Sequence, residues 1–334
     1  FLRLERGGIA RLRSLEERGK GMGKAASIVC IGGANVDRKA RLLAPFQLGT
    51  SHPVTTTQTA GGVARNVAEN LGRLAQPVSL VSAVGDDHDG QWLIDVTSRY
   101  VNTSFIVRTP KANTGTYTAV LDERGEMVLA LAGMAIYDTV GEEWLKQQWT
   151  RLGPISAVVL DTNFPKAVIR SVIAQCRQED IPLCVVTVSV PKVKRLPSDL
   201  SGVTWFVTNE AEAKEFVGRN GHTDDIMKPI LQAGAKNVVV TRGANGVAYA
   251  TKQGETGAIA APKVEVTDAT GAGDAFAAGF LYGVLGGHTV EDACRFGMSS
   301  AALTLQTAET VHPALNEHLL QAAYARYFRE GGTK

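Results

Sequence analysis

The stretch Thr267-Asp-Ala-Thr-Gly-Ala-Gly-Asp-Ala-Phe-Ala-Ala-Gly279 joins a predicted strand, ending near Val266, to a predicted helix of small apolar residues. Glycines at 271 and 273 expose backbone N–H groups at the start of that helix, where the helix dipole favours anions and a phosphate can approach closely. Asp274 would repel a phosphate unless it accepts a proton from an attacking hydroxyl. An aspartate cap after a glycine turn is the alternative, but the full string favours a phosphate site.

Apolar strands alternate with helical patterns along most of the chain. Residues 27–33 form an apolar run that ends in glycines, as a buried parallel strand does. The alternation predicts an α/β fold with a mainly parallel sheet covered by helices on both faces. Further strands are expected at 78–84, 157–161, 182–188, 204–208 and 237–241, and helices at 62–74, 90–100, 165–178, 210–217, 223–233 and, in succession, 272–329.

Two stretches, 38–60 and 112–134, break this alternation because they are extended and partly polar. The second contains a hairpin pattern, with residues 122–125 as its turn. We expect the two stretches to join into a small sheet beside the main domain.

The N-terminal segment has a different character. Residues 1–22 are a mixed-charge stretch that ends at Met22 and precedes the first clear strand. We interpret them as a non-native or disordered extension and residues 23–334 as one domain. The alternative is the tail of a DNA-binding module once attached upstream.

Composition excludes several function classes. A formal net charge of +2 over 334 residues disfavours a general nucleic-acid binder. The four cysteines form no CxxC pair and have no histidine at zinc spacing, so we expect reduced thiols in a cytoplasmic protein. Apolar runs fall short of the roughly 20 residues that span a membrane, so no membrane partner is expected.

Two further glycine motifs suit sugar hydroxyls. Gly61 and Gly62 open a predicted helix whose first turn carries Arg65 and Asn66; an ordinary glycine turn explains this motif equally well. Gly32-Gly-Ala-Asn-Val-Asp37 places Asn35 and Asp37 just beyond a strand, where open α/β sheets bind ligands. Because Asn35 and Asp37 are two residues apart in an extended segment, their side chains point the same way and suit a vicinal diol. An Asx turn is the alternative.

Gly61-Gly-Val-Ala-Arg-Asn66 and Asp268-Ala-Thr-Gly-Ala-Gly-Asp274 resemble the two signature motifs of the PfkB, or ribokinase-like, carbohydrate kinases. The resemblance covers about residues 27–325 and includes the family's VGxDxxG, NxxE and TxGxxG patterns at 84–90, 209–212 and 241–246. It implies a ribokinase-like three-layer α/β/α sandwich, with lid strands from about 38–60 and 112–134. It also implies ATP-dependent phosphorylation of an alcohol.

The resemblance assigns roles to individual residues. Asp274 is the expected catalytic base, and the expected anion hole comprises Gly271, Ala272 and Gly273. Expected acceptor contacts are Asn35, Asp37, Gly61, Gly62, Arg65, Asn66, Asp161 and Asn163. Expected ATP contacts are Thr241, Gly243, Gly246, Thr270, Asn209, Ala301 and Thr304. Glu212 and Asn209 are expected to hold Mg²⁺ through water, and Asp268 is assigned to a monovalent cation such as K⁺.

Three details resemble the pseudouridine kinases within this family: Arg65, the string Ser51-His-Pro53, and the pair Asp161 and Asn163. They imply phosphorylation of the ribose 5′-hydroxyl of pseudouridine. The strings at 132–134 and 186–189 depart from that subgroup and leave the acceptor open. Another nucleoside, or a sugar such as ribose or fructose, is the alternative acceptor, and a catalytically silent nucleoside-sensing regulator is the alternative function. The resemblance also implies a homodimer formed through the lid.

Overall fold

The computed structural model describes residues 26–329, so the predicted extension at residues 1–22 lies outside the described residues. Its core is a nine-stranded sheet in the order β13-β12-β11-β10-β9-β8-β1-β4-β5. The strands from β11 to β5 are parallel, and β12 and β13 are antiparallel at one edge. The strand bounds are β1 Ser27–Ile31, β4 Val78–Gly85, β5 Asn102–Thr109, β8 Ile155–Asp161, β9 Leu183–Val186, β10 Trp205–Asn209, β11 Asn237–Thr241, β12 Val247–Thr251 and β13 Thr256–Ile259.

Helices cover both faces of this sheet, because successive buried residues of a strand point to opposite sides. In β1, Val29 and Ile31 join one core with α4, α5, α7 and α8, whereas Ile28 and Cys30 join another with α2, α3, α9 and α10. The structure therefore confirms the predicted three-layer α/β/α arrangement. The helix bounds are α2 Val63–Arg73, α3 His88–Thr97, α4 Glu142–Arg151, α5 Lys166–Gln178, α6 Val190–Val193, α7 Glu210–Val217, α8 Thr223–Gln232, α9 Ala272–Leu285, α10 Val290–Leu305 and α11 Glu317–Tyr324, with short helical turns η1 Ala135–Thr139, η2 Gly243–Asn245 and η3 Ala325–Arg329.

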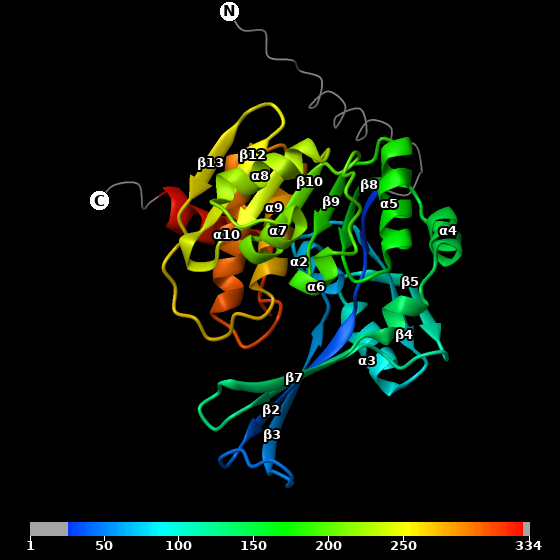
Figure 1. Cartoon of the computed structure of the whole chain (residues 1–334), viewed down its shortest axis with the longest axis vertical. Helices are drawn as coiled ribbons and strands as arrows, with labels where there is room; N and C mark the ends of the chain where they lie inside the picture. Colours follow the sequence, from blue (N-terminus) through cyan, green and yellow to red (C-terminus); the bar gives the residue numbers. More distant parts are fainter. Residues whose placement is uncertain (1–25, 330–334) are drawn as a thin grey trace, which may run out of the picture.

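A second sheet extends from one end of the body and forms the lid (Figure 1). Its order is β3-β2-β6-β7, built from β2 Asn35–Leu42, β3 Val54–Gly61, β6 Thr116–Leu121 and β7 Met127–Gly133. The pairs β2–β3 and β6–β7 are antiparallel, and the parallel pair β2–β6 joins the two hairpins. The two extended stretches therefore meet as expected, although β2 begins three residues earlier than the predicted stretch.

Small residues let α9 and α10 pack closely. A Cβ at Gly279 would lie 2.6 Å from the carbonyl oxygen of Phe296, and one at Gly283 would lie 2.7 Å from the Cα of Ala293. This packing holds the middle and the end of α9 against α10. The four cysteines of the chain are free and buried.

Candidate functional site

Three loops meet at the carboxyl edge of the main sheet, and the carboxylate of Asp161 joins them. Asp161 is fully buried at the end of β8. Its Oδ2 accepts hydrogen bonds from the backbone N–H of Gly33, at 2.8 Å, and of Ala64, at 3.0 Å. Its Oδ1 accepts from the N–H of Asn163, at 2.7 Å. The sequence predicted that Asp161 contacts the acceptor. In the structure, backbone N–H groups of the protein bind this carboxylate, so Asp161 holds the three loops together.

The glycine loop lies beside these loops. Gly271 adopts φ +82° and precedes α9, so the backbone N–H groups of the first turn of α9 are free of side-chain caps. A Cβ at Gly271 would lie 2.1 Å from the carbonyl oxygen of Thr310, which explains why glycine is required. Asp274 is half-buried in this first turn, and its Oδ2 accepts a hydrogen bond of 2.8 Å from Nδ2 of Asn66 in α2. The two sequence motifs, 208 residues apart, are thus in direct contact.

Negative charge is concentrated at this point. Burial raises the pKa of Asp274 to about 7, and the nearby charges of Asp161 and Asp37 raise it too, whereas the Asn66 hydrogen bond lowers it. Burial likewise raises the pKa of Asp37 to about 6. Asp37 accepts a hydrogen bond from Nδ2 of Asn35, so these side chains share one face of β2 as predicted. A carboxyl group that titrates near neutral pH suits general-base chemistry.

On the other side of the glycine loop lies an apolar cavity of about 590 Å³. Ala272 and Gly273 form part of its wall, and Ala301 and Leu305 of α10 lie across from them. Of the expected ATP contacts, the cavity brings together Thr241, Gly243, Gly246 and Ala301. The sequence missed other apolar lining residues, namely Pro262, Val264, Val266, Phe276 and Met298.

Three expected ATP contacts lie elsewhere. Thr304 is fully buried in α10, one residue before the lining residue Leu305, and does not line the cavity. Thr270 is exposed and donates through N and Oγ1 to Oδ1 of Asp268. Asn209 caps α7 by accepting from the N–H of Glu212, at 2.9 Å.

Glu212 and Asn209, the residues expected to hold Mg²⁺, are suited to binding it through water molecules. Glu212 is buried, and its Oε2 accepts a hydrogen bond from Thr187. Within residues 26–329 no group of three His, Cys, Asp or Glu side chains could hold a metal directly. One carboxylate and one amide are a sparse donor set, which Mg²⁺ tolerates because it retains water ligands.

The residue expected to hold K⁺ has a protein partner. Lys39 of β2 donates to Oδ2 of Asp268 and forms an ion pair with it. Thr270 donates to Oδ1, so both oxygens of this carboxylate already have partners within the protein. Lys39 was missed in the sequence, although it follows Asn35 and Asp37 at two-residue spacing and so lies on the same face of the strand.

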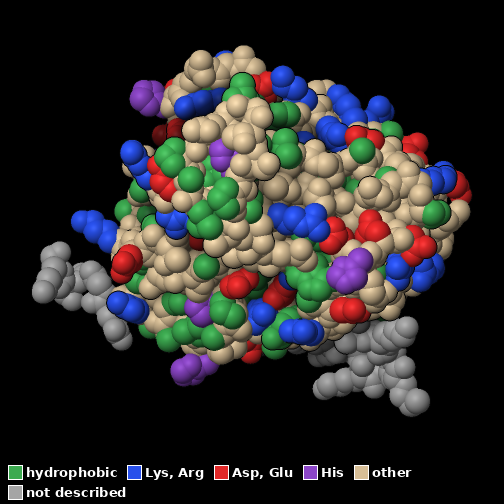
Figure 2. Space-filling view, turned by 90° about the horizontal axis from the view of Figure 1, so that it is seen from below, with side chains coloured by type: hydrophobic (Ala, Val, Ile, Leu, Met, Phe, Trp, Pro, Cys, Tyr) green, Lys and Arg blue, Asp and Glu red, His purple; other side chains and the backbone are tan. Residues whose placement is uncertain are grey.

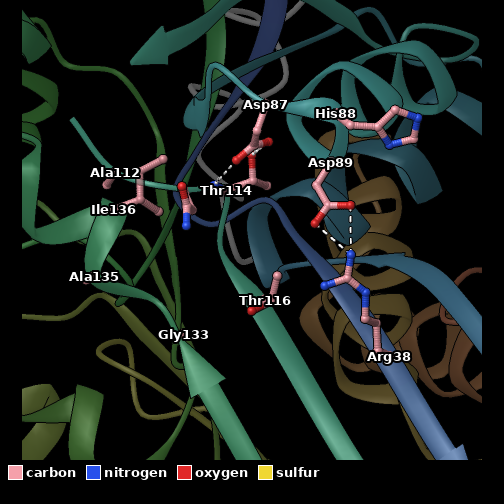
Figure 3. A pocket seen from close by; sticks show the side chains of 11 residues that line it. Arg38, Asp87, His88, Asp89, Ala112, Thr114, Thr116, Gly133, Ala135 and Ile136 are labelled. Carbon is pink, nitrogen blue, oxygen red and sulfur yellow. Dashed lines mark hydrogen bonds and ion pairs between the residues drawn. The ribbon is translucent and has the colours of Figure 1, made fainter. Parts of the chain in front are cut away.

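A second cavity, of about 780 Å³, lies between the base of the lid and the start of α3 (Figure 3). Arg38 lines it and donates two hydrogen bonds, of 2.8 and 2.7 Å, to Asp89. Asp87 accepts from the N–H and the hydroxyl of Thr114, which ties α3 to the lid. Because Arg38 lies between Asp37 and Lys39 in β2, it points to the opposite face of the lid. The lid sheet therefore separates this cavity from Asp37.

Two expected acceptor contacts are used within the protein. Arg65 is 4% exposed, and its guanidinium donates to Asn66, Glu69, Thr97 and the carbonyl of Ala60. Asn163 is 3% exposed; it donates to Asp161 and accepts from Lys192. In contrast, Gly61 lies against Asp37, since a Cβ at Gly61 would collide with that carboxylate, whereas a Cβ at Gly62 would collide with the backbone of Gly33 and Ala34.

Comparison with known proteins identifies relatives along most of the chain. The pfkB family carbohydrate kinase model matches residues 25–317. The pseudouridine kinase of Escherichia coli K12 is 30% identical over 296 residues, which cover 86% of this chain and 93% of that protein. The guanosine-inosine kinase of Exiguobacterium acetylicum is 28% identical over 288 residues, 84% of this chain and 95% of that protein. A solved structure of Arabidopsis thaliana ribokinase complexed with ribose and ATP has a TM-score of 0.79 at 20% identity, covering 90% and 98% of the two chains.

None of the helices described between residues 26 and 329 has the length and apolar character needed to cross a membrane.

The clamp at Asp161 yields a stability prediction. In Asp161→Asn the amide NH₂ would face backbone N–H donors that the carboxylate now accepts from, and each buried donor left unpaired costs about 1–3 kcal/mol. We expect the free energy of unfolding in urea to fall by about 2–5 kcal/mol. Asp199→Asn, in an exposed turn, is the matched control and should leave the midpoint nearly unchanged. Equal midpoints for the two variants would contradict the clamp.

Proposed function

The chain belongs to the pfkB family of carbohydrate kinases, and from this premise we propose that it transfers the γ-phosphoryl group of ATP to the 5′-hydroxyl of a ribose-containing nucleoside, with pseudouridine as the preferred acceptor. The observation that carries the proposal is the position of Asp274. It lies at the start of α9, between the apolar cavity and the side chains of Asn35 and Asp37, and contacts the second motif through Asn66.

ATP suits the apolar cavity. Its adenine would pack against Met298, Ala301 and Leu305, and its phosphates would reach the backbone N–H groups at Gly271 and Gly273. A helix N-terminus without side-chain caps is a favourable anion site. The structure of Arabidopsis thaliana ribokinase, which shares this fold, was solved with ribose and ATP, and this supports ATP as the phosphate donor.

In the proposed reaction Asp274 accepts the proton of the acceptor hydroxyl as that oxygen attacks the γ-phosphorus. The new O–P bond forms as the bond to the β,γ-bridging oxygen breaks, and ADP leaves. Backbone N–H groups of the glycine loop stabilise the charge on the equatorial oxygens. Asn35 and Asp37 hold the sugar diol, and the lid excludes water, which limits hydrolysis of ATP.

Magnesium would be held through water by Glu212 and Asn209. When bound, it would neutralise charge on the phosphates of ATP. A K⁺ ion at Asp268 would compete with the positive charge of Lys39, and an assay in potassium-free buffer tests whether it contributes.

The acceptor is assigned from the relatives together with the subgroup residues. A nucleoside acceptor agrees with relatives named pseudouridine kinase and guanosine-inosine kinase, which differ in the base they act on. A coupled assay of ADP release with pseudouridine, uridine, inosine, guanosine, adenosine, ribose and fructose tests the proposal. The highest kcat/KM should be for pseudouridine. A higher value for ribose or fructose would overturn the nucleoside assignment, and no acceptor-dependent ADP release together with tight nucleoside binding would favour a silent sensor.

The assigned base yields a prediction for Asp274→Asn. The amide retains the size of the side chain and cannot accept the proton, so kcat should fall by about 10²–10⁴-fold, the usual contribution of general-base catalysis. Binding of ATP, measured by calorimetry, should change less than about threefold. Near-native turnover by this variant would refute the assignment of the base.

The raised pKa of Asp274 predicts the acid side of the pH profile. The base must be deprotonated to act, and its pKa lies near 7. Below that pH the protonated form dominates, so kcat/KM for the acceptor should fall about tenfold per pH unit and level off above it. An acid limb near pH 4, the ordinary range of an aspartate, would contradict this assignment.

The lid supports a proposed homodimer. β7 is exposed along its length, and the apolar side chains of Met127 and Leu131 are 60% and 61% exposed. Figure 2 views the molecule from the lid end. Sedimentation should show a dimer at micromolar concentration and a monomer for Leu131→Arg. Val190→Arg, on the main body, is the control and should remain dimeric. A monomeric unmodified protein would dispose of the proposal.

A further inference from the structure

Arg65 is a buried cation directly behind the proposed base. It lies in the first turns of α2, with its guanidinium 4% exposed and paired with Glu69 one turn later. Its Nε donates to the hydroxyl of Thr97, at 3.3 Å, and one NH1 hydrogen to the carbonyl of Ala60, at 2.9 Å. Donors used in this way leave Arg65 no direct role in holding an acceptor.

The remaining contact of Arg65 controls the side chain of Asn66. NH1 of Arg65 donates to Oδ1 of Asn66 at 2.8 Å. A guanidinium has donors and no acceptor, so it can face only the oxygen of the amide. The Nδ2 of Asn66 must then point the other way, and it donates to Oδ2 of Asp274 at 2.8 Å. The orientation of the amide is therefore set by its neighbour in the chain.

Glu69 and Arg73 hold the far end of this network. Oε1 of Glu69 accepts from Nε of Arg73 at 2.8 Å, and the guanidinium of Arg73 stacks on Tyr100 at 4.0 Å from the ring centroid. Arg73 also donates to the carbonyl oxygen of Pro313. A continuous series of hydrogen bonds thus runs from Arg73 through Glu69, Arg65 and Asn66 to Asp274.

We propose that Arg65 is a positioning residue of the kinase. It orients the Asn66 amide toward Asp274, and its positive charge offsets the negative charges of Asp37 and Asp161 near that base. The inference rests on the proposed function of Asp274 as the base. It replaces the expectation that Arg65 contacts the acceptor.

The charges around Asp274 support this role. Asp37 approaches from β2 and Asp161 from β8, and both disfavour the ionised form of Asp274. From α2, Arg65 favours the ionised form by its charge, and Asn66 favours it by its hydrogen bond. Burial lowers the pKa of Arg65 to about 10, so it stays protonated at neutral pH. Without Arg65, the base would be protonated over more of the physiological range.

Only arginine can do both tasks. It contacts four partners at once through a planar fork. A lysine would retain the charge but could not hold Asn66 and the other partners in the same geometry, and a methionine would lose both properties. The two substitutions therefore separate orientation from charge.

The experiment titrates Asp274 in the full chain without substrates, following its ¹³Cγ NMR signal, which is assigned by its absence in Asp274→Asn. In Arg65→Met the pKa of Asp274 should rise by about half to one unit, the effect of removing a nearby cation. The acid limb of the kcat/KM profile should move by the same amount. Arg99 is an exposed arginine that lines the cleft beside Arg65 and Arg73, so Arg99→Met is the matched control. It should change neither the pKa of Asp274 nor the acid limb of the kcat/KM profile.

Arg65→Lys tests orientation even if Arg65→Met does not fold. The charge is kept but the Asn66 hydrogen bond to Asp274 is weakened, so the pKa of Asp274 should rise less than in Arg65→Met, while the plateau of kcat falls at least about tenfold because Asn66 is no longer fixed. An unchanged plateau in Arg65→Lys, or a uniform loss in Arg65→Met at every pH without a change in the titration, would overturn the inference. A shifted titration in a protein that phosphorylates no acceptor would instead overturn the proposed function alone.

Discussion

The buried carboxylate of Asp161 is the interaction on which the rest of the site depends. It accepts N–H groups from the loop after β1, the start of α2 and the loop after β8, so one side chain fixes three segments that are distant in sequence. The strand with Asn35 and Asp37 leaves the first segment, and Asn66 lies in the second. A carboxylate buried with this many donors remains paired, because leaving such groups unsatisfied is costly.

The same arrangement explains why the site needs a buried cation. Asp161 adds to the negative charge that Asp37 and Asp274 carry, and an enzyme that delivers a polyanionic nucleotide to this point must balance that charge. Burial, together with repulsion from Asp161 and Asp37, raises the pKa of Asp274 to about 7, and the charge of Arg65 limits that rise. Close approach of these carboxylates is unfavourable for stability because their charges repel, but it favours the raised pKa that proton transfer needs.

Local patterns predicted the elements well and the side-chain partners poorly. The glycine loop, the start of α7 and the hairpin of β6 and β7 follow from spacing and turn chemistry, which act within a few residues. The short edge strands β12 and β13 were missed because they gain most of their stability from neighbouring strands, and β5 was missed because most of its residues are exposed or half-buried. The strand predicted to end near Val266 is wrong, because residues 260–266 form irregular chain. Burial of Arg65, displacement of Thr304 from the cavity and the pairing of Lys39 with Asp268 all depend on contacts between distant segments. Glu69, four residues after Arg65, was a local signal of that burial.

The ladder between β2 and β6 has a mechanical consequence. It joins both hairpins of the lid into one twisted plate, so neither hairpin can swing without the other. The plate is attached at a rung where Asn35 pairs with Gly61, beside the groups that would grip the sugar. Eight residues of extended chain span about 27 Å, so a tilt of about 10° at that rung would move the far tip by about 5 Å. Binding of a sugar beside Asn35 and Gly61 would therefore change the position of the far tip of the lid.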